Sequence, residues 1–224
     1  MGFNMDLNIV LESEDNRVEI ERFIQKIFMK QYDANITQYL PWLFSIQNKN
    51  EEIQGALGLR GAHGSDLFLE QYLDGSIEKI ASNIVGVDIF RDDVIEVGNL
   101  AVTSKGGARM LIHMLTAFLR GAGYKWVVFT APKLLINSFK RLDLPLHHLA
   151  NAKPGSLIDT ESDWGSYYDN NPQVVIGNVN EGFELLNKNP NISQVESAMV
   201  WNQAYAKGYM YRVKKNNTPP RIAV

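Results

Sequence analysis

One stretch constrains the fold of this chain more than any other, because it contains a buried strand, a glycine-containing turn and an amphipathic helix in succession. The strand is Val94–Val102, the turn is Thr103–Arg109, and the helix begins at Met110. A second apolar run follows at Trp126–Thr130, and its continuous apolar character is typical of a strand buried on both faces. With a further amphipathic helix over Lys133–Leu142, the pattern predicts a β–α–β unit with a right-handed crossover inside an α/β fold.

Weaker patterns predict elements on both sides of this unit. Apolar residues at three- and four-residue spacing predict a helix over Arg17–Gln31. Pro41 breaks any helix over Tyr32–Phe44, an aromatic segment that either covers a pocket or packs on the core. Further strands are expected at Leu7–Leu11, Ile53–Arg60, His147–Ala152 and Gln173–Ile176, and further helices at Val179–Leu186 and between Ser193 and Tyr205. We predict one main domain over residues 1–185, then a C-terminal helix and a mobile tail, beginning at Lys214, over residues 186–224.

Composition excludes several classes of function. The net charge of −3 gives no reason to expect nucleic acid or an anionic membrane as a partner. The absence of cysteine excludes disulfides, thiolate metal sites and a cysteine nucleophile, and it fits a reducing compartment. Met1–Val10 lacks the pattern of a signal peptide, and no window of about 20 residues is free of charge, so we expect a cytoplasmic protein without integral membrane association. The four histidines show no metal-ligand spacing, and Ser104 and Ser166 lack the context of a hydrolase nucleophile.

The glycine turn is a possible anion site. Gly106 and Gly107 precede a helix, where unpaired backbone N–H groups can bind a phosphate. The spacing matches neither the nucleotide-triphosphate loop nor the dinucleotide fingerprint. The two glycines therefore either hold an anion or only make the turn.

Glu96 is the one acidic residue in its apolar strand. A carboxylate in a partly apolar site has a raised pKa, which suits it to deprotonate an amine. The alternative is that Glu96 faces solvent or pairs with a lysine. Strand alternation predicts that Glu96 shares a face with Gly98 and Leu100, opposite Asn99.

Glu70 and Tyr72 are two residues apart in the apolar run Leu67–Leu73 and would share one face of a strand. They either contact a substrate, with Tyr72 as a general acid, or are a rim carboxylate and a packed tyrosine.

Three segments resemble the GNAT acyltransferases. Glu96–Val102, with the basic glycine-containing turn and the helix that follow it, resembles their acyl-donor motif. Trp126–Thr130 is similar to the next strand of that fold, and Asn137–Leu144 to its asparagine-containing helix, with Phe139 in place of a tyrosine and Asp143 in place of a glycine. The resemblance implies a mixed, mostly antiparallel central sheet with helices on both faces and a C-terminal helical extension.

A wider set of stretches makes the chain similar to the family of thermostable hemolysins, whose layout resembles that of the acyl-homoserine-lactone synthases. These stretches are Leu67–Leu73, Glu96–Ala101, Trp126–Ala131, Asn137–Leu142 and Trp164–Tyr168.

The resemblance implies an N-acyltransferase with no permanently bound cofactor. Its donor substrate would be acyl-CoA or acyl-phosphopantetheine on a carrier protein, and its acceptor a small amine such as an amino acid. Glu96 would be the base, and Tyr72 would protonate the leaving thiolate. The implied donor-binding residues are Leu100, Ala101, Val102, Gly106, Gly107, Ala108 and Asn137, and the implied acceptor-binding residues are Glu70, Asn99 and Thr130.

The turn departs from the GNAT pattern, because the position of its basic residue falls on Thr103 and Lys105 is out of register. Two donors therefore stay open: either free CoA, or the phosphopantetheine of a carrier protein, which is all that a shortened pyrophosphate loop would grip. The hemolysin name indicates a different class of function, a membrane-active or lipid-binding protein with an exposed apolar surface. The sequence shows no secretion signal and no long alternating hairpin that could insert into a bilayer, which favours acyl transfer.

Overall fold

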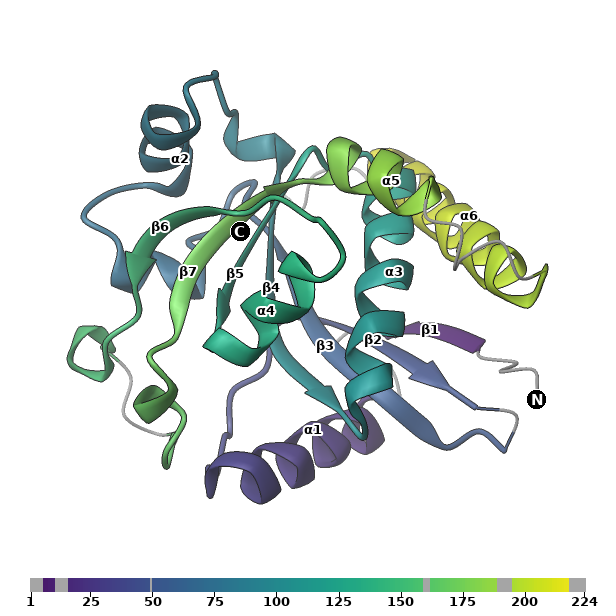
Figure 1. Ribbon diagram of the computed structural model, residues 1–224, viewed down its shortest axis with the longest axis horizontal. Coiled ribbons are helices and arrows are strands. Elements are labelled where there is room, and N and C mark those ends of the chain that lie inside the picture. The colour runs from purple at the N-terminus through teal and green to yellow at the C-terminus, as the bar shows by residue number, and fades with distance from the viewer. Residues whose placement is uncertain (1–5, 11–15, 49, 159–161, 189–194, 218–224) are drawn as a thin grey trace.

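The computed structural model describes residues 6–10, 16–48, 50–158, 162–188 and 195–217, and its centre is a seven-stranded sheet in the order β1-β2-β3-β4-β5-β7-β6 (Figure 1). The strands are β1 (Asp6–Val10), β2 (Trp42–Gln47), β3 (Ile53–Gly61), β4 (Val94–Val102), β5 (Trp126–Ala131), β6 (His147–Asn151) and β7 (Gln173–Asn178). All neighbours pair antiparallel except β4 and β5, which are parallel. A parallel pair needs a crossover connection, and α3 provides it.

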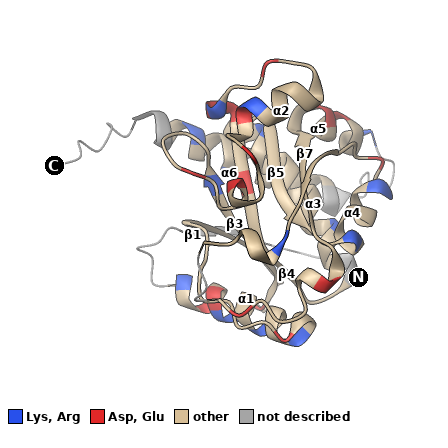
Figure 2. Cartoon of the chain, turned by 90° about the vertical axis from the view of Figure 1, so that its left-hand side faces the viewer, with Lys and Arg blue, Asp and Glu red and all other residues tan. Residues whose placement is uncertain are grey.

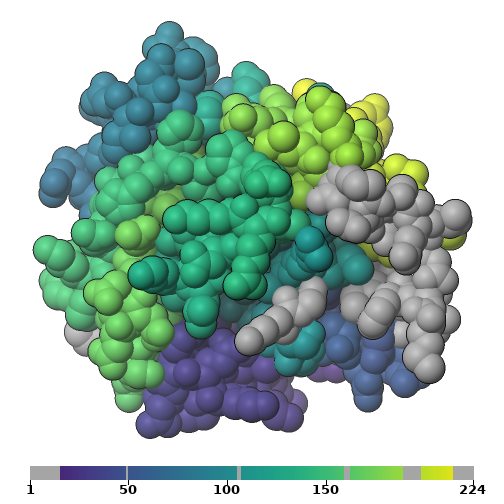
Figure 3. Space-filling model, viewed as in Figure 1, coloured from purple at the N-terminus to yellow at the C-terminus, as the bar shows by residue number. Residues whose placement is uncertain are grey.

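Helices cover both faces of the sheet. The helices are α1 (Arg17–Tyr32), α2 (Ile77–Val85), α3 (Lys105–Ala122), α4 (Lys133–Lys140), α5 (Val179–Asn187) and α6 (Val195–Asn217), and the short 3₁₀ helices are η1 (Phe68–Tyr72), η2 (Arg91–Asp93), η3 (Pro154–Ser156) and η4 (Tyr168–Asn170). The helices α3 to α6 pack on one face of the sheet, and α1 and α2 pack on the other. Figure 3 shows α4 between α1 and α5. The predicted mixed, mostly antiparallel sheet with helices on both faces is confirmed.

The crossover helix α3 and the C-terminal helix α6 touch through their backbones. Ser104 caps the N-terminus of α3, and Gly123 ends it in the left-handed region at φ 85°. A Cβ at Gly121 would overlap the backbone oxygen of Tyr205, and one at Gly208 would overlap that of Phe118. Only glycine permits this approach, so α6 is part of the same packed body as α3.

A gap opens in the sheet between β4 and β5. Their pairing joins Val94–Val97 to Trp126–Phe129 and then stops, although both strands continue. At this point β4 contains a bulge, because Asn99 is left-handed at φ 52° and the register with β3 shifts. Beyond the bulge β4 stays with β3 and diverges from β5 (Figure 1).

The bulge overturns one prediction about the faces of β4. Glu96 and Gly98 share a face as expected, but the extra residue moves Leu100 to the face of Val97, where it packs on the α3 side. Ala101 then takes the α1 side, packed with Ala56. A bulge reverses strand alternation for every residue after it.

Four further differences separate the structure from the sequence prediction. The run Leu67–Leu73 contains the 3₁₀ helix η1 and no strand, and the strand β2 was not predicted. The glycines Gly106 and Gly107 lie in the first turn of α3, which begins at Lys105. The helix α6 runs on to Asn217, past the expected start of the tail at Lys214, and the rest of the expected tail lies outside the described residues. Within the described ranges, no helix is long and apolar enough to cross a membrane.

Charged residues of both signs are interspersed along α1 and around α2 (Figure 2). This distribution agrees with the small net charge of the chain, −3.

Candidate active site

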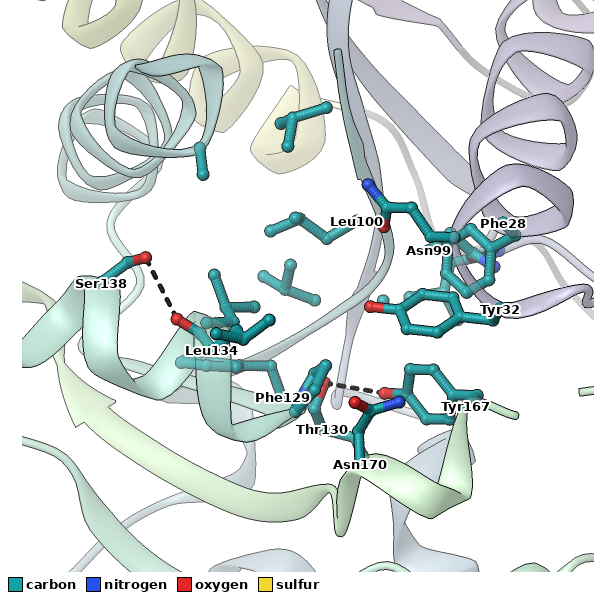
Figure 4. Close-up of a pocket in the computed structure, with 18 of the residues that line it drawn as sticks. Phe28, Tyr32, Asn99, Leu100, Phe129, Thr130, Leu134, Ser138, Tyr167 and Asn170 are labelled. Carbon is teal, nitrogen blue, oxygen red and sulfur yellow. Dashed lines mark hydrogen bonds between the residues drawn. The ribbon is translucent and has the colours of Figure 1, made fainter. Parts of the chain in front are cut away.

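A pocket of about 780 Å³ fills the gap between β4 and β5 and connects the two faces of the sheet. On the α1 side its wall is largely aromatic, formed by Phe28, Tyr32, Phe68, Tyr72, Trp164 and Tyr167. On the α3 and α4 side it is lined by Ala108, Leu134, Leu135, Asn137, Ser138 and Arg141. In Figure 4, Tyr32 and Tyr167 lie across the pocket from Leu134 and Ser138. The site is therefore a passage through the sheet with chemically different ends.

Glu96 forms part of the wall of this pocket and is only 3% exposed. Its two carboxylate oxygens accept hydrogen bonds from the backbone N–H groups of Phe68, at 2.9 Å, and Leu69, at 2.8 Å. Burial raises the pKa of Glu96 to about 7, against the lowering effect of the two backbone hydrogen bonds and of the Arg60 charge. The carboxylate can therefore exchange a proton near neutral pH. Glu96 therefore does not face solvent, and no lysine whose side chain the structure describes forms an ion pair with it.

The short helix η1 holds the two donors of Glu96, and Glu70 fixes η1 in place. Glu70 accepts hydrogen bonds from the backbone N–H groups of Leu67 and Ile77, both at 2.8 Å. It also forms an ion pair with Arg91 at 2.8 Å. Burial alone would raise the pKa of Glu70, but the hydrogen bonds from Arg91 and the two backbone groups lower it below its ordinary value. Glu70 is not among the residues that line the pocket, so it supports the wall from behind.

Tyr72 lines the pocket next to Glu96, and its hydroxyl lies 2.6 Å from that of Tyr168. Burial, with the hydrogen bond to Tyr168, raises the pKa of Tyr72 above its ordinary value. Such a phenol holds its proton firmly, so it is better suited to orient a substrate than to release a proton.

Asn99 lies in the pocket wall, but its side chain is occupied by the segment 38–40. Its Oδ1 accepts from the backbone N–H of Leu40 at 3.0 Å, and its Nδ2 donates to the carbonyl of Gln38 at 3.1 Å. Asn99 therefore joins the bulge of β4 to the segment that carries Tyr39 and Leu40 into the pocket. The predicted aromatic segment before β2 does cover a pocket.

Replacing Asn99 by alanine is expected to lower the free energy of unfolding by about 2–3 kcal/mol. The change removes two hydrogen bonds and puts alanine in the left-handed region. Urea denaturation measures the effect, and Asn99→Gly separates its two causes, because glycine keeps the backbone conformation but not the hydrogen bonds. An Asn99→Ala protein as stable as the wild type would contradict this role.

The family of the chain follows from a comparison of its sequence. A model of the thermostable hemolysin family matches residues 10–183. The chain belongs to the thermostable hemolysin family. No curated protein matches the sequence.

Solved structures similar to this thermostable hemolysin family member include an N-acyl amino acid synthase and acyl-homoserine lactone synthases. FeeM, an N-acyl amino acid synthase from uncultured soil microbes, has a TM-score of 0.56 at 14% identity, over 80% of this chain and 92% of its own. BjaI, a CoA-dependent acyl-homoserine lactone synthase solved with SAM and isopentyl-CoA, has a TM-score of 0.56 at 10% identity, over 88% and 99%. TofI, solved in a ternary complex with an inhibitor and MTA, has a TM-score of 0.52 at 12% identity, over 84% and 99%. At these identities the likeness shows a shared, GNAT-like fold.

The pocket of the family member contains most of the residues expected from the sequence. Leu100, Val102, Ala108, Asn137 and Thr130 line it, together with Glu96, Tyr72 and Asn99. Of the expected residues whose surroundings the structure describes, three are not among its lining: Ala101, Gly107 and Glu70. Ala101 is buried on the α1 side of the sheet as a result of the bulge, and the Gly107 N–H is bonded to the Ser104 hydroxyl at 3.1 Å. The expected free N–H at Gly107 is therefore already paired within the helix cap.

Several features of this pocket were not predicted from the sequence. Arg60 lines the pocket, and Arg91 anchors η1, but a single arginine in a strand or loop carries no sequence signal for either role. The contact between the hydroxyls of Tyr72 and Tyr168 joins distant parts of the chain, so the sequence carries no signal for this pairing. The backbone donors at Phe68 and Leu69 depend on a 3₁₀ helix, which the apolar run did not indicate.

Proposed function

We propose that this protein is an N-acyltransferase that moves an acyl group from a phosphopantetheine thioester to the amine of an acceptor such as an amino acid, forming an amide. The observation that carries the proposal is the buried carboxylate of Glu96, held by two backbone N–H groups, in the wall of a pocket between two diverging parallel strands. The base and the room for two substrates are thus combined in one place. The shared fold of the solved synthases supports the same class of reaction.

The gap between β4 and β5 offers backbone groups to the pantetheine arm. Thr103 donates its backbone N–H to Gln54 of β3 at 3.1 Å. In an antiparallel ladder alternate residues point their backbone groups the other way, so the N–H and C=O of Val102 face the gap. An extended arm with two amide groups can pair with such an edge as a strand would. Asn137 and Ser138 of α4 lie on the opposite wall.

In the reaction, the amine nitrogen attacks the thioester carbonyl carbon, a C–N bond forms and the C–S bond breaks. Glu96, directly or through a water molecule, takes the proton that the nitrogen loses. The thiolate leaves and takes the proton that Glu96 accepted from the amine, because burial raises the pKa of Tyr72 and makes it a weaker acid. The released thiol is CoA or the phosphopantetheine of a carrier protein.

Mass spectrometry tests this proposal. The purified protein is incubated with acyl-CoA and acyl-carrier-protein donors of several chain lengths and with a panel of amino acids and amines. We expect an amide product and an equal amount of free thiol. If no donor gives an acylated amine and thioester hydrolysis stays at background, the proposal is wrong. Leakage from liposomes that needs no thioester donor would instead favour the membrane-active alternative in the family name.

A further inference from the structure

Arg60 is the cation nearest to Glu96 along the sheet. The β3–β4 register pairs Arg60 directly with Glu96, so both side chains stand on the same face of the two strands. Both line the pocket, and the Arg60 charge acts on the Glu96 carboxylate. A positive and a negative group therefore lie side by side at the α1 end of the passage.

The two groups do not neutralise each other by direct contact. Both oxygens of Glu96 are bonded to the backbone of η1, and no ion pair joins Arg60 to a carboxylate within the described ranges. The one hydrogen bond of Arg60 to another described residue runs from Nη1 to the carbonyl of Asp66, at 3.2 Å. A guanidinium has five N–H donors, so most of them are left to meet a ligand in the pocket.

We propose that Arg60 binds the carboxylate of the acceptor, so that the acceptors of this enzyme are α-amino acids and Arg60 determines that specificity. This inference rests on the proposed acyl transfer. The amine of an α-amino acid and its carboxylate are attached to one carbon, and the paired Glu96 and Arg60 present a base and an anion-binding fork at neighbouring positions. Arginine suits the second role because its planar fork matches a carboxylate with two parallel hydrogen bonds.

The surroundings favour an amino acid over a phosphate of the donor. Arg60 pairs with β4 before the bulge, on the face covered by η1, whereas the free edge at Val102 lies beyond the bulge. Next to Glu96 the wall consists of the aromatic residues Phe68 and Tyr72, with Trp164 packed on Phe68 at 6.1 Å between ring centroids. An aromatic wall can contact the side chain of an amino acid, but neither Phe68 nor Tyr72 supplies a second cation for a phosphate.

The test compares each amino acid with the amine that lacks its carboxylate. L-phenylalanine is paired with phenethylamine and L-leucine with isoamylamine, and kcat/KM is measured for the wild type, Arg60→Gln and Arg60→Lys with one acyl donor. We expect Arg60→Gln to lower kcat/KM for the amino acids by about 10- to 100-fold, the usual effect of losing hydrogen bonds to a charged group, and to change it for the amines by less than about threefold. Arg60→Lys keeps the charge without the fork and should fall in between.

Arg141→Gln is the matched control, because Arg141, the residue that follows α4, lines the same pocket at its other end. It should leave the ratio between amino acid and amine unchanged. Isothermal titration calorimetry of L-phenylalanine and phenethylamine with the wild type gives a second result that needs no turnover. We expect the amino acid to bind at least about tenfold more tightly, by the same argument.

The outcomes separate this inference from the function on which it rests. Acylation that ignores the carboxylate, or an Arg60→Gln enzyme with the wild-type ratio, overturns the role of Arg60 and leaves acyl transfer standing. No acylation of any amine by the wild type overturns both. Thermal unfolding of each variant shows whether it is folded. If Arg60→Gln does not fold, the calorimetric comparison of L-phenylalanine and phenethylamine with the wild type decides whether the site recognises a carboxylate.

Discussion

Replacing Glu96 by glutamine is expected to lower kcat/KM for acyl transfer by about 10²- to 10⁴-fold, the usual contribution of a general base. Glutamine has nearly the shape of glutamate, and its carbonyl can still accept from one of the two N–H groups of η1. It cannot take a proton from the acceptor amine. The rate of thiol release in the presence of saturating donor measures the loss.

The wild-type pH profile should contain the ionisation of Glu96. The base acts only when deprotonated, so kcat/KM is expected to rise with pH through about 7, the pKa to which burial raises this carboxyl. The acceptor amine also loses its proton as pH rises, and the Glu96→Gln profile contains that ionisation alone. The difference between the two profiles therefore isolates Glu96.

Stability should depend on pH for the same reason. The pKa of Glu96 is raised from 4.5 to about 7 on folding, so between these values the folded state binds more protons than the unfolded state. The free energy of unfolding then decreases as pH rises through this window, by about 3 kcal/mol from this group. The stability difference between Glu96→Gln and the wild type should therefore shift in favour of the variant from pH 5 to pH 8, as urea denaturation can measure.

Glu184→Gln is the control for the measurements of rate and of stability, because Glu184 is an exposed glutamate on α5 and undergoes the same chemical change. It should leave the rate and both pH profiles unchanged. A Glu96→Gln enzyme with more than about a tenth of the wild-type kcat/KM would show that the carboxylate is structural, since a general base contributes more than that.

The sequence predicts the part of the site that depends on local patterns. Val94–Val102 and Trp126–Thr130 are apolar runs bounded by turns, and such runs form strands wherever the rest of the chain covers them. Glu96 is conspicuous for the same reason, as the one charge in a buried strand. These features need no knowledge of distant contacts, and the structure has them as expected.

The rest of the site depends on contacts between distant residues, and these the sequence does not reveal. Asn99 takes a left-handed conformation because its amide is held by Gln38 and Leu40, and the resulting bulge moves Leu100 to the opposite face. The 3₁₀ helix η1 is held by Glu70 and Arg91, although the apolar run alone favours a strand. In both places a few side-chain hydrogen bonds override the periodicity on which the prediction relied.

Replacing Gly208 by alanine is expected to lower the free energy of unfolding by about 2–3 kcal/mol, because the new methyl group meets backbone and not a flexible side chain. It would overlap the carbonyl of Phe118 and lie 2.9 Å from the nitrogen of Ala122, so α3 and α6 must move apart. Alanine favours a helix over glycine by about 1 kcal/mol, and the clash must exceed this gain. Valine at the same position should destabilise the protein further.

Met210→Ala is the matched control, since Met210 is two residues away on the same helix and 61% exposed. It should change the stability by less than about 0.5 kcal/mol. Urea denaturation followed by tryptophan fluorescence measures both variants, because Trp201 of α6 is buried against α5 and reports the docking of the helix. If Gly208→Ala is as stable as Met210→Ala, then α6 is loosely attached and the predicted boundary near residue 185 separates two independent parts. A single cooperative transition at lower urea would instead make α6 part of the domain that carries the pocket, because α3, which α6 covers, also contributes Ala108 to the pocket wall.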